Sequence, residues 1–450
     1  MKNRSRPGEI KPHITEQDDS HTPYENARYR YYVLAVLTLV YAFNFIDRQL
    51  LVILQEPVKA DLGLSDTQLG LLTGFAFAVF YVVCGIPIAR WADKSVRRSI
   101  IALSLTVWSA MTALSGITQN FSQLLLARMG VGVGEAGGSP PAHSMISDIF
   151  KPASRATALS FYSVGIYIGI LIGFMLGGWI AEYFGWRLAF FVVGLPGIAL
   201  ALVVRFTVRE PIRGWSEGAS GRVAPAVPLG RVLHLLWSRR SFRFLIMAAS
   251  LDAFLIYGIG NWLPSYFLRT YDISIGELGT WLAISSGVGG GAGSFFGGWA
   301  ADRLGASDRR WYLWLPAILI MLVMPVLFVL ISIKTIYLGL LLTVPFYFLS
   351  AAYLGPTLAI SHTLVHPRMR ALTSAILFFL INLIGMGLGP LSIGYLSDVL
   401  TKAGGAAPLA HSMLSIGVSA ALVTSVTFFL AARDVREDIA ALGQQTAATE

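Results

Sequence analysis

The sequence predicts an all-α integral membrane protein with 12 transmembrane helices in two six-helix halves and both termini in the cytoplasm. Three observations support this prediction: the composition, the spacing of apolar runs and the alternation of charge in the loops. Of the 450 residues, 55% are hydrophobic and only 13% are charged, whereas about a quarter of the residues in soluble domains are charged. A soluble protein of this composition would lack the polar surface to cover itself, so the apolar runs are assigned to a bilayer.

The apolar runs have the length of membrane-spanning helices, which need about 20 predominantly apolar residues. The predicted spans are 31–54, 69–90, 99–119, 122–145, 157–181, 187–206, 243–268, 278–300, 311–332, 335–361, 371–396 and 410–432. The same runs divide the chain into an N-terminal tail (1–30), a first bundle (31–206), a linker (207–242), a second bundle (243–432) and a C-terminal tail (433–450).

Basic residues concentrate in every second loop, beginning with Lys94, Arg97 and Arg98 after the second span. Cytoplasmic loops of membrane proteins collect Lys and Arg, so these loops, the linker and both termini are predicted to be cytoplasmic. This placement accounts for the net charge of +9, and no nucleic-acid partner is expected. The single cysteine, Cys84, excludes a disulfide framework within the chain.

The two halves repeat a loop, which reads "ARWADKSVRR" after the second span and "GGWAADRLGASDRR" after the eighth. These loops resemble the signature of the major facilitator superfamily. The second copy matches well, whereas the first has Ala89 and Val96 where glycines are usual. The resemblance implies the major facilitator fold and a latch that closes the cytoplasmic side. The residues it assigns to this gating latch are Asp93, Arg97, Arg98, Asp302 and Arg303.

Charged residues interrupt the first and fourth spans. Asp47 and Arg48 lie in "YAFNFIDRQLLV", and Arg128 and Glu135 lie two helical turns apart in "ARMGVGVGEAGG". A charge at the bilayer centre costs about 3 kcal/mol or more, so these side chains are expected to face the protein interior. A buried ion pair that only fixes packing is the alternative to a functional role.

Depth along the helix axes suggests which charges can meet. Asp47 is placed roughly 6 Å and Arg128 about 9 Å from the span centres, on the outward side. Asp47 and Arg128 can therefore pair if their helices face the same cavity. Arg48 points about 100° away from Asp47, and is interpreted as a packing residue or as the partner of Glu135.

The order from Asn44 to Arg48, together with the spacing of Arg128 and Glu135, resembles the Spinster family of lysolipid and sphingosine-1-phosphate transporters. The stretches "MISDIFKPASRATALSFYSVGIYIG" and "YGIGNWLPSYFLRT" extend the resemblance. It implies that Asp47 and Glu135 couple transport to protons and that Arg128 lies in the cavity. The predicted substrate and cavity residues are Arg128, Arg48, Asn44, Tyr162, Tyr257, Asn261 and Trp262.

The function implied by the resemblance is proton-coupled secondary active transport of an amphipathic lipid, a lysophospholipid or a relative of sphingosine-1-phosphate, by alternating access. The expected protein is a monomer in a bacterial inner membrane, with protons as the coupling ion and no cofactor. A proton-coupled organic-anion symporter and a multidrug exporter are alternatives. A lipid-modifying enzyme is disfavoured, because the sequence holds no metal-ligand cluster, nucleotide-phosphate loop or nucleophile triad.

Overall fold

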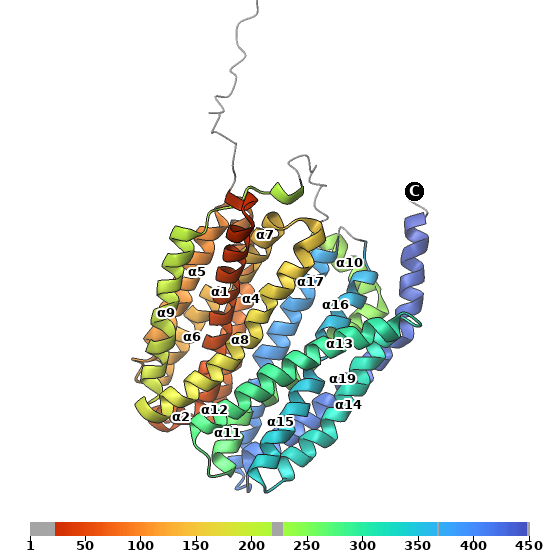
Figure 1. The fold of residues 1–450 in the computed structure, drawn as a ribbon. Helices are drawn as coiled ribbons and strands as arrows, with labels where there is room; N and C mark the ends of the chain where they lie inside the picture. Colours follow the sequence, from red (N-terminus) through yellow and green to blue (C-terminus); the bar gives the residue numbers. More distant parts are fainter. Residues whose placement is uncertain (1–22, 218–227, 367–368, 448–450) are drawn as a thin grey trace, which may run out of the picture.

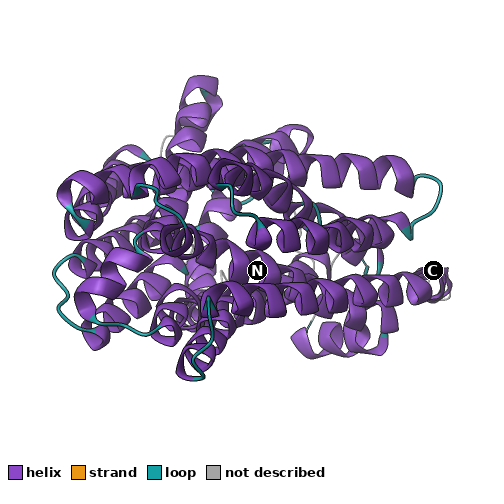
Figure 2. Ribbon diagram, turned by 90° about the horizontal axis from the view of Figure 1, so that it is seen from below, coloured by secondary structure: helices purple, strands orange, loops and turns teal. Residues whose placement is uncertain are grey.

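The computed structural model describes residues 23–217, 228–366 and 369–447. These residues form helices joined by short loops, and they contain no strand (Figure 2). Parts of the predicted tails (1–22 and 448–450) and of the predicted linker (218–227) lie outside the described residues. The all-helical fold class predicted from the composition is therefore confirmed for the described part of the chain.

The first half of the chain, here called the N-half, lies to the left in Figure 1, in red to yellow-green. A short 3-10 turn, η1 (Pro23–Glu25), precedes it. Its elements are α1 (Ala27–Ile53), α2 (Gln55–Leu62), α3 (Asp66–Gly70), η2 (Leu71–Phe75), α4 (Ala76–Lys94), α5 (Arg97–Ser115), α6 (Phe121–Glu135), α7 (Ser139–Ile149), α8 (Pro152–Phe184) and α9 (Trp186–Thr207).

The second half, here called the C-half, lies to the right in Figure 1, in green to blue. Two linker elements lead into it, η3 (Trp215–Glu217) and α10 (Leu229–Ser238). Its elements are α11 (Arg240–Thr270), α12 (Ile275–Ile284), η4 (Ser285–Gly289), α13 (Gly290–Gly305), α14 (Trp311–Ser332), α15 (Ile336–Ala351), α16 (Leu354–Thr363), α17 (Arg370–Leu380), η6 (Ile381–Leu388), α18 (Gly389–Lys402) and α19 (Pro408–Ala447).

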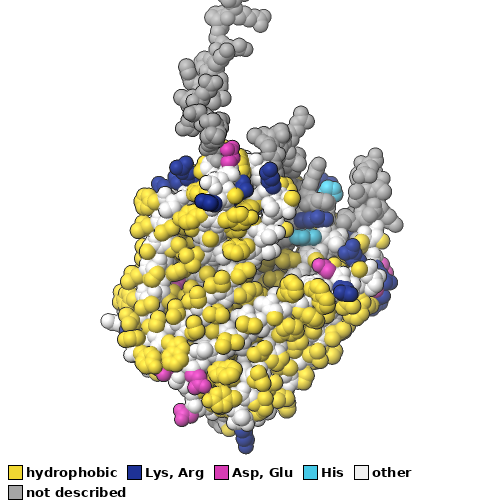
Figure 3. Space-filling view, in the orientation of Figure 1, with side chains coloured by type: hydrophobic (Ala, Val, Ile, Leu, Met, Phe, Trp, Pro, Cys, Tyr) yellow, Lys and Arg dark blue, Asp and Glu magenta, His cyan; other side chains and the backbone are white. Residues whose placement is uncertain are grey.

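The chain starts α1 and ends α19 at the same end of the molecule, here called the terminus face; the other end is called the opposite face (Figure 1). Between the two faces, hydrophobic side chains cover the visible side of the molecule, whereas most of the visible Lys and Arg lie near the terminus face (Figure 3). Large apolar side chains are exposed in this band, including Phe206 and Phe295, each 77% exposed. A bilayer is the solvent that fits such a surface.

Ten helical segments of the described residues are long and apolar enough to cross a membrane. The two other predicted spans, 122–145 and 278–300, are not among these ten. The turn at 136–138 divides the first into α6 and α7, whereas the second is helical throughout, with the π-helical segment η4 between α12 and α13. Glycines are frequent in both regions and lower the helix propensity. The number of twelve crossings stays a prediction.

A stripe of glycines on α8 fixes the orientation of α1. A Cβ atom on Gly165 would lie 2.7 Å from the carbonyl oxygen of Thr38, and one on Gly173 would lie 2.9 Å from Cβ of Gln49. Small residues allow two helices to approach this closely. Because Ile46 also contacts Gly173, and residues two apart on a helix point about 200° apart, Arg48 is turned away from α8.

The linker helix α10 is amphipathic and packs on the C-half. Val232 and Leu236 are buried in the C-half core, whereas Leu229, Leu233 and Trp237 are exposed. The spacing of four residues in both sets places them on two faces of the helix.

Candidate functional site: a buried charge cluster in the N-half

An ion pair joins α1 to α6 in the interior of the N-half. Nε of Arg48 donates to Oε2 of Glu135 over 2.8 Å. The Glu135 side chain is fully buried, and that of Arg48 is 12% exposed. The sequence allowed Arg48 to be either a packing residue or the partner of Glu135, and the structure shows that it is the partner of Glu135.

Aromatic rings surround the Arg48 guanidinium. Its carbon Cζ lies 5.0 Å from the ring centre of Phe45, 4.8 Å from that of Phe77 and 5.1 Å from that of Tyr81. Cation–π contacts of this kind stabilise a partly desolvated guanidinium by about 0.5–2 kcal/mol each. The rings therefore provide an apolar environment in which Arg48 keeps its charge.

Arg48 also faces the C-half. Its Nη1 lies 3.9 Å from the sulfur of Met386 in η6, and its charge interacts with Tyr257 of α11. The predicted cavity residues Arg48 and Tyr257, which are far apart in the sequence, therefore lie near enough to interact electrostatically across the interface between the halves.

Asp47 and Arg128 lie deeper in the N-half, and they are 1% and 2% exposed. They interact electrostatically, but no ion pair joins them, so the direct contact that the sequence allowed is not formed in this state. Oδ1 of Asp47 and both Nε and Nη1 of Arg128 have no hydrogen-bond partner among the described residues. The Arg128 guanidinium lies instead over the ring of Phe77, with Cζ 5.6 Å from the ring centre.

The glycine run of α6 positions this cluster. A Cβ atom on Gly132 would lie 2.7 Å from the carbonyl oxygen of Phe77, and one on Gly134 would lie 2.6 Å from the backbone nitrogen of Trp108. The glycines thus bring α4 and α5 against α6. The close approach places Thr112 of α5 beside Asp47, while Asn44 of α1 lies beside Glu135.

The remaining predicted cavity residues occupy two different places. Tyr162 is buried in the N-half and stacks on Tyr41, with ring centres 4.5 Å apart. Trp262 lies in a hydrophobic core that both halves share, and it donates from Nε1 to the carbonyl oxygen of Pro390 over 2.8 Å. Asn261 accepts a 2.8 Å hydrogen bond from Gln55 through its backbone oxygen. Asn261 and Trp262 therefore lie outside the charge cluster.

Polar contacts join the two halves toward the opposite face. Nη2 of Arg269 in α11 donates to Glu56 and to Asp66, each over 2.7 Å. The carboxylate of Asp398 in α18 accepts from the backbone nitrogens of Asp66 (3.0 Å) and Thr67 (2.8 Å), and from the Thr67 hydroxyl (2.5 Å).

Two buried contacts of Gln55 add to this set. Gln55 donates to the backbone oxygen of Asn261 and accepts from the Ser265 hydroxyl over 3.0 Å. We call Gln55, Glu56, Asp66, Thr67, Ser265, Arg269 and Asp398 the opposite-face gate.

The predicted gating latch makes no bond between the halves in this state. Arg97 is buried and binds only N-half and linker groups: Asp148, Ser144, Glu210 and the carbonyl oxygen of Pro211. Arg98 binds Glu210 and the carbonyl oxygen of Val208. Asp93 is exposed and has no partner among the described residues.

The second copy of the latch is likewise confined to its own half. Asp302 accepts a 2.8 Å hydrogen bond from the Tyr312 hydroxyl, and Arg303 lies over the ring of Trp299, with Cζ 5.8 Å from the ring centre. That the two copies act together as a latch therefore stays a prediction, and it concerns a state in which the halves meet at the terminus face.

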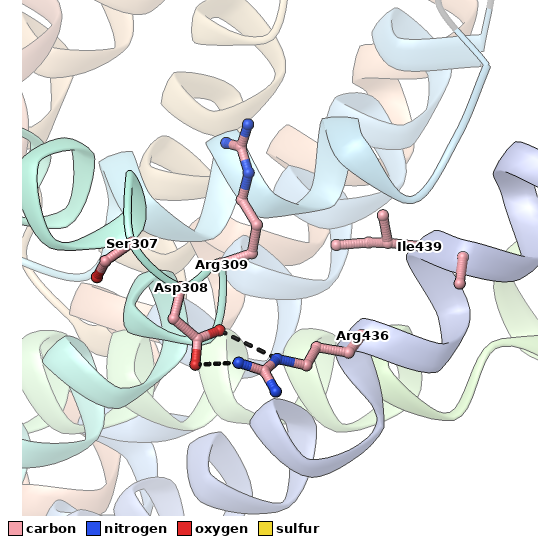
Figure 4. Close-up of a pocket in the computed structure, with 6 residues that line it drawn as sticks. Ser307, Asp308, Arg309, Arg436 and Ile439 are labelled. Carbon is pink, nitrogen blue, oxygen red and sulfur yellow. Dashed lines mark hydrogen bonds and ion pairs between the residues drawn. The ribbon is translucent and has the colours of Figure 1, made fainter.

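The loop after α13 is tied to α19 beside a surface pocket of about 290 Å³ (Figure 4). Asp308 accepts from Arg436 over 2.6 Å and from Arg310 over 2.9 Å. Partial burial favours the neutral carboxyl, but the hydrogen bonds from Arg310 and Arg436 outweigh it and hold the pKa of Asp308 below its usual value. This pocket lies at the terminus face, within the C-half.

The hydrogen bonds between α1–α9 and α11–α19 within the described ranges lie from the middle of the molecule to the opposite face. Besides the opposite-face gate, the set includes Tyr167 to Ser294 (2.6 Å), Trp179 to Thr280 (2.9 Å) and the Gly276 nitrogen to Glu182 (2.8 Å). The halves are therefore held together toward the opposite face, and at the terminus face no hydrogen bond joins them among the residues that the structure describes.

Several residues of the site escaped the sequence interpretation. The gate residues were missed because single charges near predicted loops are common and do not mark partners. The rings of Phe45, Phe77 and Tyr81 around Arg48 could be recognised in the sequence only as part of a general excess of aromatic residues. Asp252 of α11 had a usable signal, since it is a carboxylate inside an apolar run, as Asp47 is. The described residues hold no group of three or more His, Cys, Asp or Glu side chains suited to a metal ion.

Comparisons with known proteins agree with this architecture. The sequence profile of the Major Facilitator Superfamily matches residues 37–390. An MFS-type efflux pump of Mycolicibacterium smegmatis is 34% identical over 426 residues, which cover 94% of this chain and 97% of the pump. A sphingosine-1-phosphate transporter of Danio rerio is 27% identical over 237 residues, which cover 52% of this chain and 47% of that transporter.

A solved structure gives the same fold. It is that of a bacterial homologue of the human lysosomal transporter Spinster, in an inward-facing and unoccupied conformation. The two chains superpose with a TM-score of 0.82 at 30% identity, covering 92% of this chain and 99% of the homologue. The resemblance to the Spinster family and the major facilitator fold are thereby confirmed. With the profile match over most of its length, the chain belongs to the Major Facilitator Superfamily of membrane transporters.

Proposed function

We propose that the protein is a proton-coupled secondary active transporter of anionic amphipathic lipids, such as lysophospholipids or sphingosine-1-phosphate-like molecules. It works by alternating access, as a monomer in a bacterial inner membrane, with the terminus face in the cytoplasm. The lipid class is supported by the similarity to the sphingosine-1-phosphate transporter. The cytoplasmic placement is supported by the Lys and Arg near the terminus face.

The observation that carries the proposal is the Arg48–Glu135 ion pair at the interface between the halves. While Glu135 is ionised, its carboxylate occupies the guanidinium. A proton on Glu135 removes the attraction and leaves Arg48 charged and available. A guanidinium presents a planar set of donors that fits a phosphate, so Glu135 and the lipid headgroup compete for the same group.

The surroundings of Arg48 suit the rest of an amphipathic molecule. The rings of Phe45, Phe77 and Tyr81 offer apolar contact next to the charge. Behind Arg48, Asp47 is proposed as the second protonatable acid. Arg128, whose Nε and Nη1 have no partner among the described residues, provides the positive charge that makes the cluster selective for anions.

Proton movement and lipid transport are coupled if binding of the proton and of the lipid both change the equilibrium between the two access states. A ligand shifts an equilibrium only by its differential affinity for the two states. The opposite-face gate must open for the site to be reached from that face, and the predicted latch is proposed to close the terminus face in return. Binding at Arg48, which contacts Met386 of the C-half, gives the site a route to both halves.

The test is uptake of labelled sphingosine-1-phosphate and labelled lysophosphatidic acid into proteoliposomes, with and without a pH gradient. We expect the gradient to change the initial rate about tenfold, which corresponds to about 1.4 kcal/mol of coupling. Glu135→Gln should abolish the dependence on the gradient, whereas the exposed control Glu437→Gln should keep it. Protein-free liposomes with an entrapped dye control for leakage caused by the lipids themselves.

Two outcomes would contradict the proposal. Uptake that ignores the gradient would exclude proton coupling. Full coupling in the Asp47→Asn, Glu135→Gln double variant would exclude these acids as the proton sites.

Export of amphipathic drugs is the second candidate, and the similarity to the mycobacterial efflux pump favours it. The same assay separates the two functions. Proton-driven transport of cationic dyes, without transport of lysolipid, would support the exporter. Competition by short carboxylates alone would support an organic-anion symporter.

A further inference from the structure

The C-half contains a buried carboxylic acid that the charge cluster does not include. Asp252 is the only Asp, Glu, Lys or Arg between Arg243 and Arg269 of α11, and it is 1% exposed. Its Oδ1 has no hydrogen-bond partner among the described residues. Asp252 is therefore an acid in the interior of a membrane-embedded bundle.

Within the described ranges, no cation compensates this acid. None of the described Lys, Arg and His side chains makes an ion pair or an electrostatic interaction with Asp252. The titratable group that faces it from a neighbouring element is Tyr353, which directly precedes α16 and is itself buried. Tyr353 also interacts with Tyr257, on the same helix as Asp252.

Two buried hydroxyl groups lie close to Tyr353 in the sequence. Thr357 follows Tyr353 by one helical turn, since its nitrogen donates to the carbonyl oxygen of Tyr353 over 3.0 Å, and Ser350 lies at the end of α15, before the turn at 352–353. Both are buried, and neither hydroxyl oxygen has a hydrogen-bond partner among the described residues. Ser350 and Thr357 thus add polar but uncharged groups on either side of Tyr353 in the sequence.

An ionised carboxylate in such a place is strongly unfavourable, and acids in this situation take up a proton instead. We propose that Asp252 is a proton-binding site in the C-half, separate from the Asp47–Glu135 cluster of the N-half. Intramembrane acids of this kind mark proton pathways in transporters. The proton site does not depend on the proposed lipid substrate.

A row of polar side chains that influence one another electrostatically runs from Asp252 toward the N-half cluster. Tyr353 interacts with Asp252 and Tyr257, Tyr257 interacts with Arg48, and Arg48 binds Glu135. The row crosses the interface between the halves at Tyr257 and Arg48. When the halves move, the distance between Tyr257 and Arg48 changes. Protonation of Asp252 is therefore expected to differ between the two access states.

The direct test is infrared difference spectroscopy of the purified protein in lipid nanodiscs near neutral pH. The carbonyl-stretch band of a protonated carboxyl is expected in the wild type and should lose one carboxyl's intensity in Asp252→Asn. The exposed control Asp272→Asn should keep the full band. Asp252→Glu keeps a titratable group and should show a shifted band, which provides a readout if Asp252→Asn folds poorly.

A second measurement is the pH dependence of thermal unfolding. If Asp252 is protonated when folded, it releases its proton on unfolding at any pH above about 4. The wild type should then lose stability relative to Asp252→Asn as the pH rises from 5 to 8, by about a factor of ten in the unfolding equilibrium for each pH unit.

An unchanged carboxyl band in Asp252→Asn, or a stability difference that does not vary with pH, would overturn the proposal. Neither measurement uses a substrate. A failure of lipid uptake would therefore leave the result for Asp252 intact, and an ionised Asp252 would leave the proposed transport function intact.

Discussion

The two faces of the molecule use similar polar side chains for different purposes. At the opposite face, Arg269 and Asp398 of the C-half bind residues of the N-half. At the terminus face, Arg97 and Asp438 make no bond between the halves within the described part of the chain. Arg97 of the N-half binds residues of the N-half and the linker, and Asp438 of the C-half binds the first turn of α11 in the same half. The contacts at one face therefore hold the halves together, and those at the other stabilise each half separately.

This difference shows at which face the halves are held together in this structure. The homologous Spinster structure with which this chain superposes is in an inward-facing conformation. Substitutions at the two faces should consequently change different quantities, either the balance between access states or the stability of one half.

The largest expected effect is on stability, at Arg97. The Arg97 side chain is buried, and Arg97→Ala leaves Asp148 and Glu210 without their cation. Breaking a buried ion pair by removing one partner costs about 3–5 kcal/mol. Thermal unfolding followed by tryptophan fluorescence should show a decrease of several degrees. The exposed control Arg433→Ala should unfold at the wild-type temperature.

Arg269→Ala should instead shift the access equilibrium. It removes the bonds to Glu56 and Asp66 and should favour opening of the opposite face by about 2 kcal/mol, since these groups are partly solvated. In a Cys84→Ser background, the rate at which an impermeant thiol reagent labels Ser265→Cys should rise at least about tenfold.

Arg187→Ala provides the matched control for Arg269→Ala. Arg187 binds Asp61 at the same end of the chain's N-half, so this change removes an ion pair without breaking a bond between the halves. Equal labelling in the two variants would show that loss of charge, and not opening of the gate, controls access to Ser265→Cys. A rise in labelling caused by Arg97→Ala would show that Arg97 also acts between the halves.

A smaller shift is expected for Asp398→Asn. Asp398 caps the first turn of α3 in the N-half, and replacing a capping carboxylate costs about 1 kcal/mol. Labelling of Ser265→Cys should rise about fivefold. Asp438 accepts from the Ser241 nitrogen over 2.9 Å and from its hydroxyl over 2.6 Å, within the C-half. Asp438→Asn should therefore leave the labelling rate unchanged and lower only the unfolding temperature.

The fold was largely predictable, because lipid imposes strong constraints on sequence. Apolar runs of spanning length must be helices, since a bilayer offers no partner for free backbone groups. Glycines mark close helix approaches, as at Gly165 and Gly134. Interrupted spans were harder to delimit, because a π-helical segment such as η4 keeps the apolar pattern while it changes the hydrogen-bond spacing.

The candidate site was predictable in its members but not in its contacts. The sequence marked four charged residues as candidates because a charge within a membrane span is costly and is usually functional. They are Asp47, Arg48, Arg128 and Glu135. Their pairing depends on helix rotation, which the glycines of α6 and α8 decide through contacts with α1, α4 and α5. A rotation of one residue, about 100°, would exchange Asp47 for Arg48 at the interface between the halves.

The sequence by itself determined that this is a helical membrane transporter, which side chains are charged within the spans and which loops are basic. These properties are local, because each follows from composition and period along one segment. Only the tertiary structure decided that Arg48 pairs with Glu135, that none of the described cations lies beside Asp252 and that the bonds between the halves gather toward the opposite face. Each of these depends on the distance between helices that are far apart in the chain, and helix packing, not hydropathy, sets that distance.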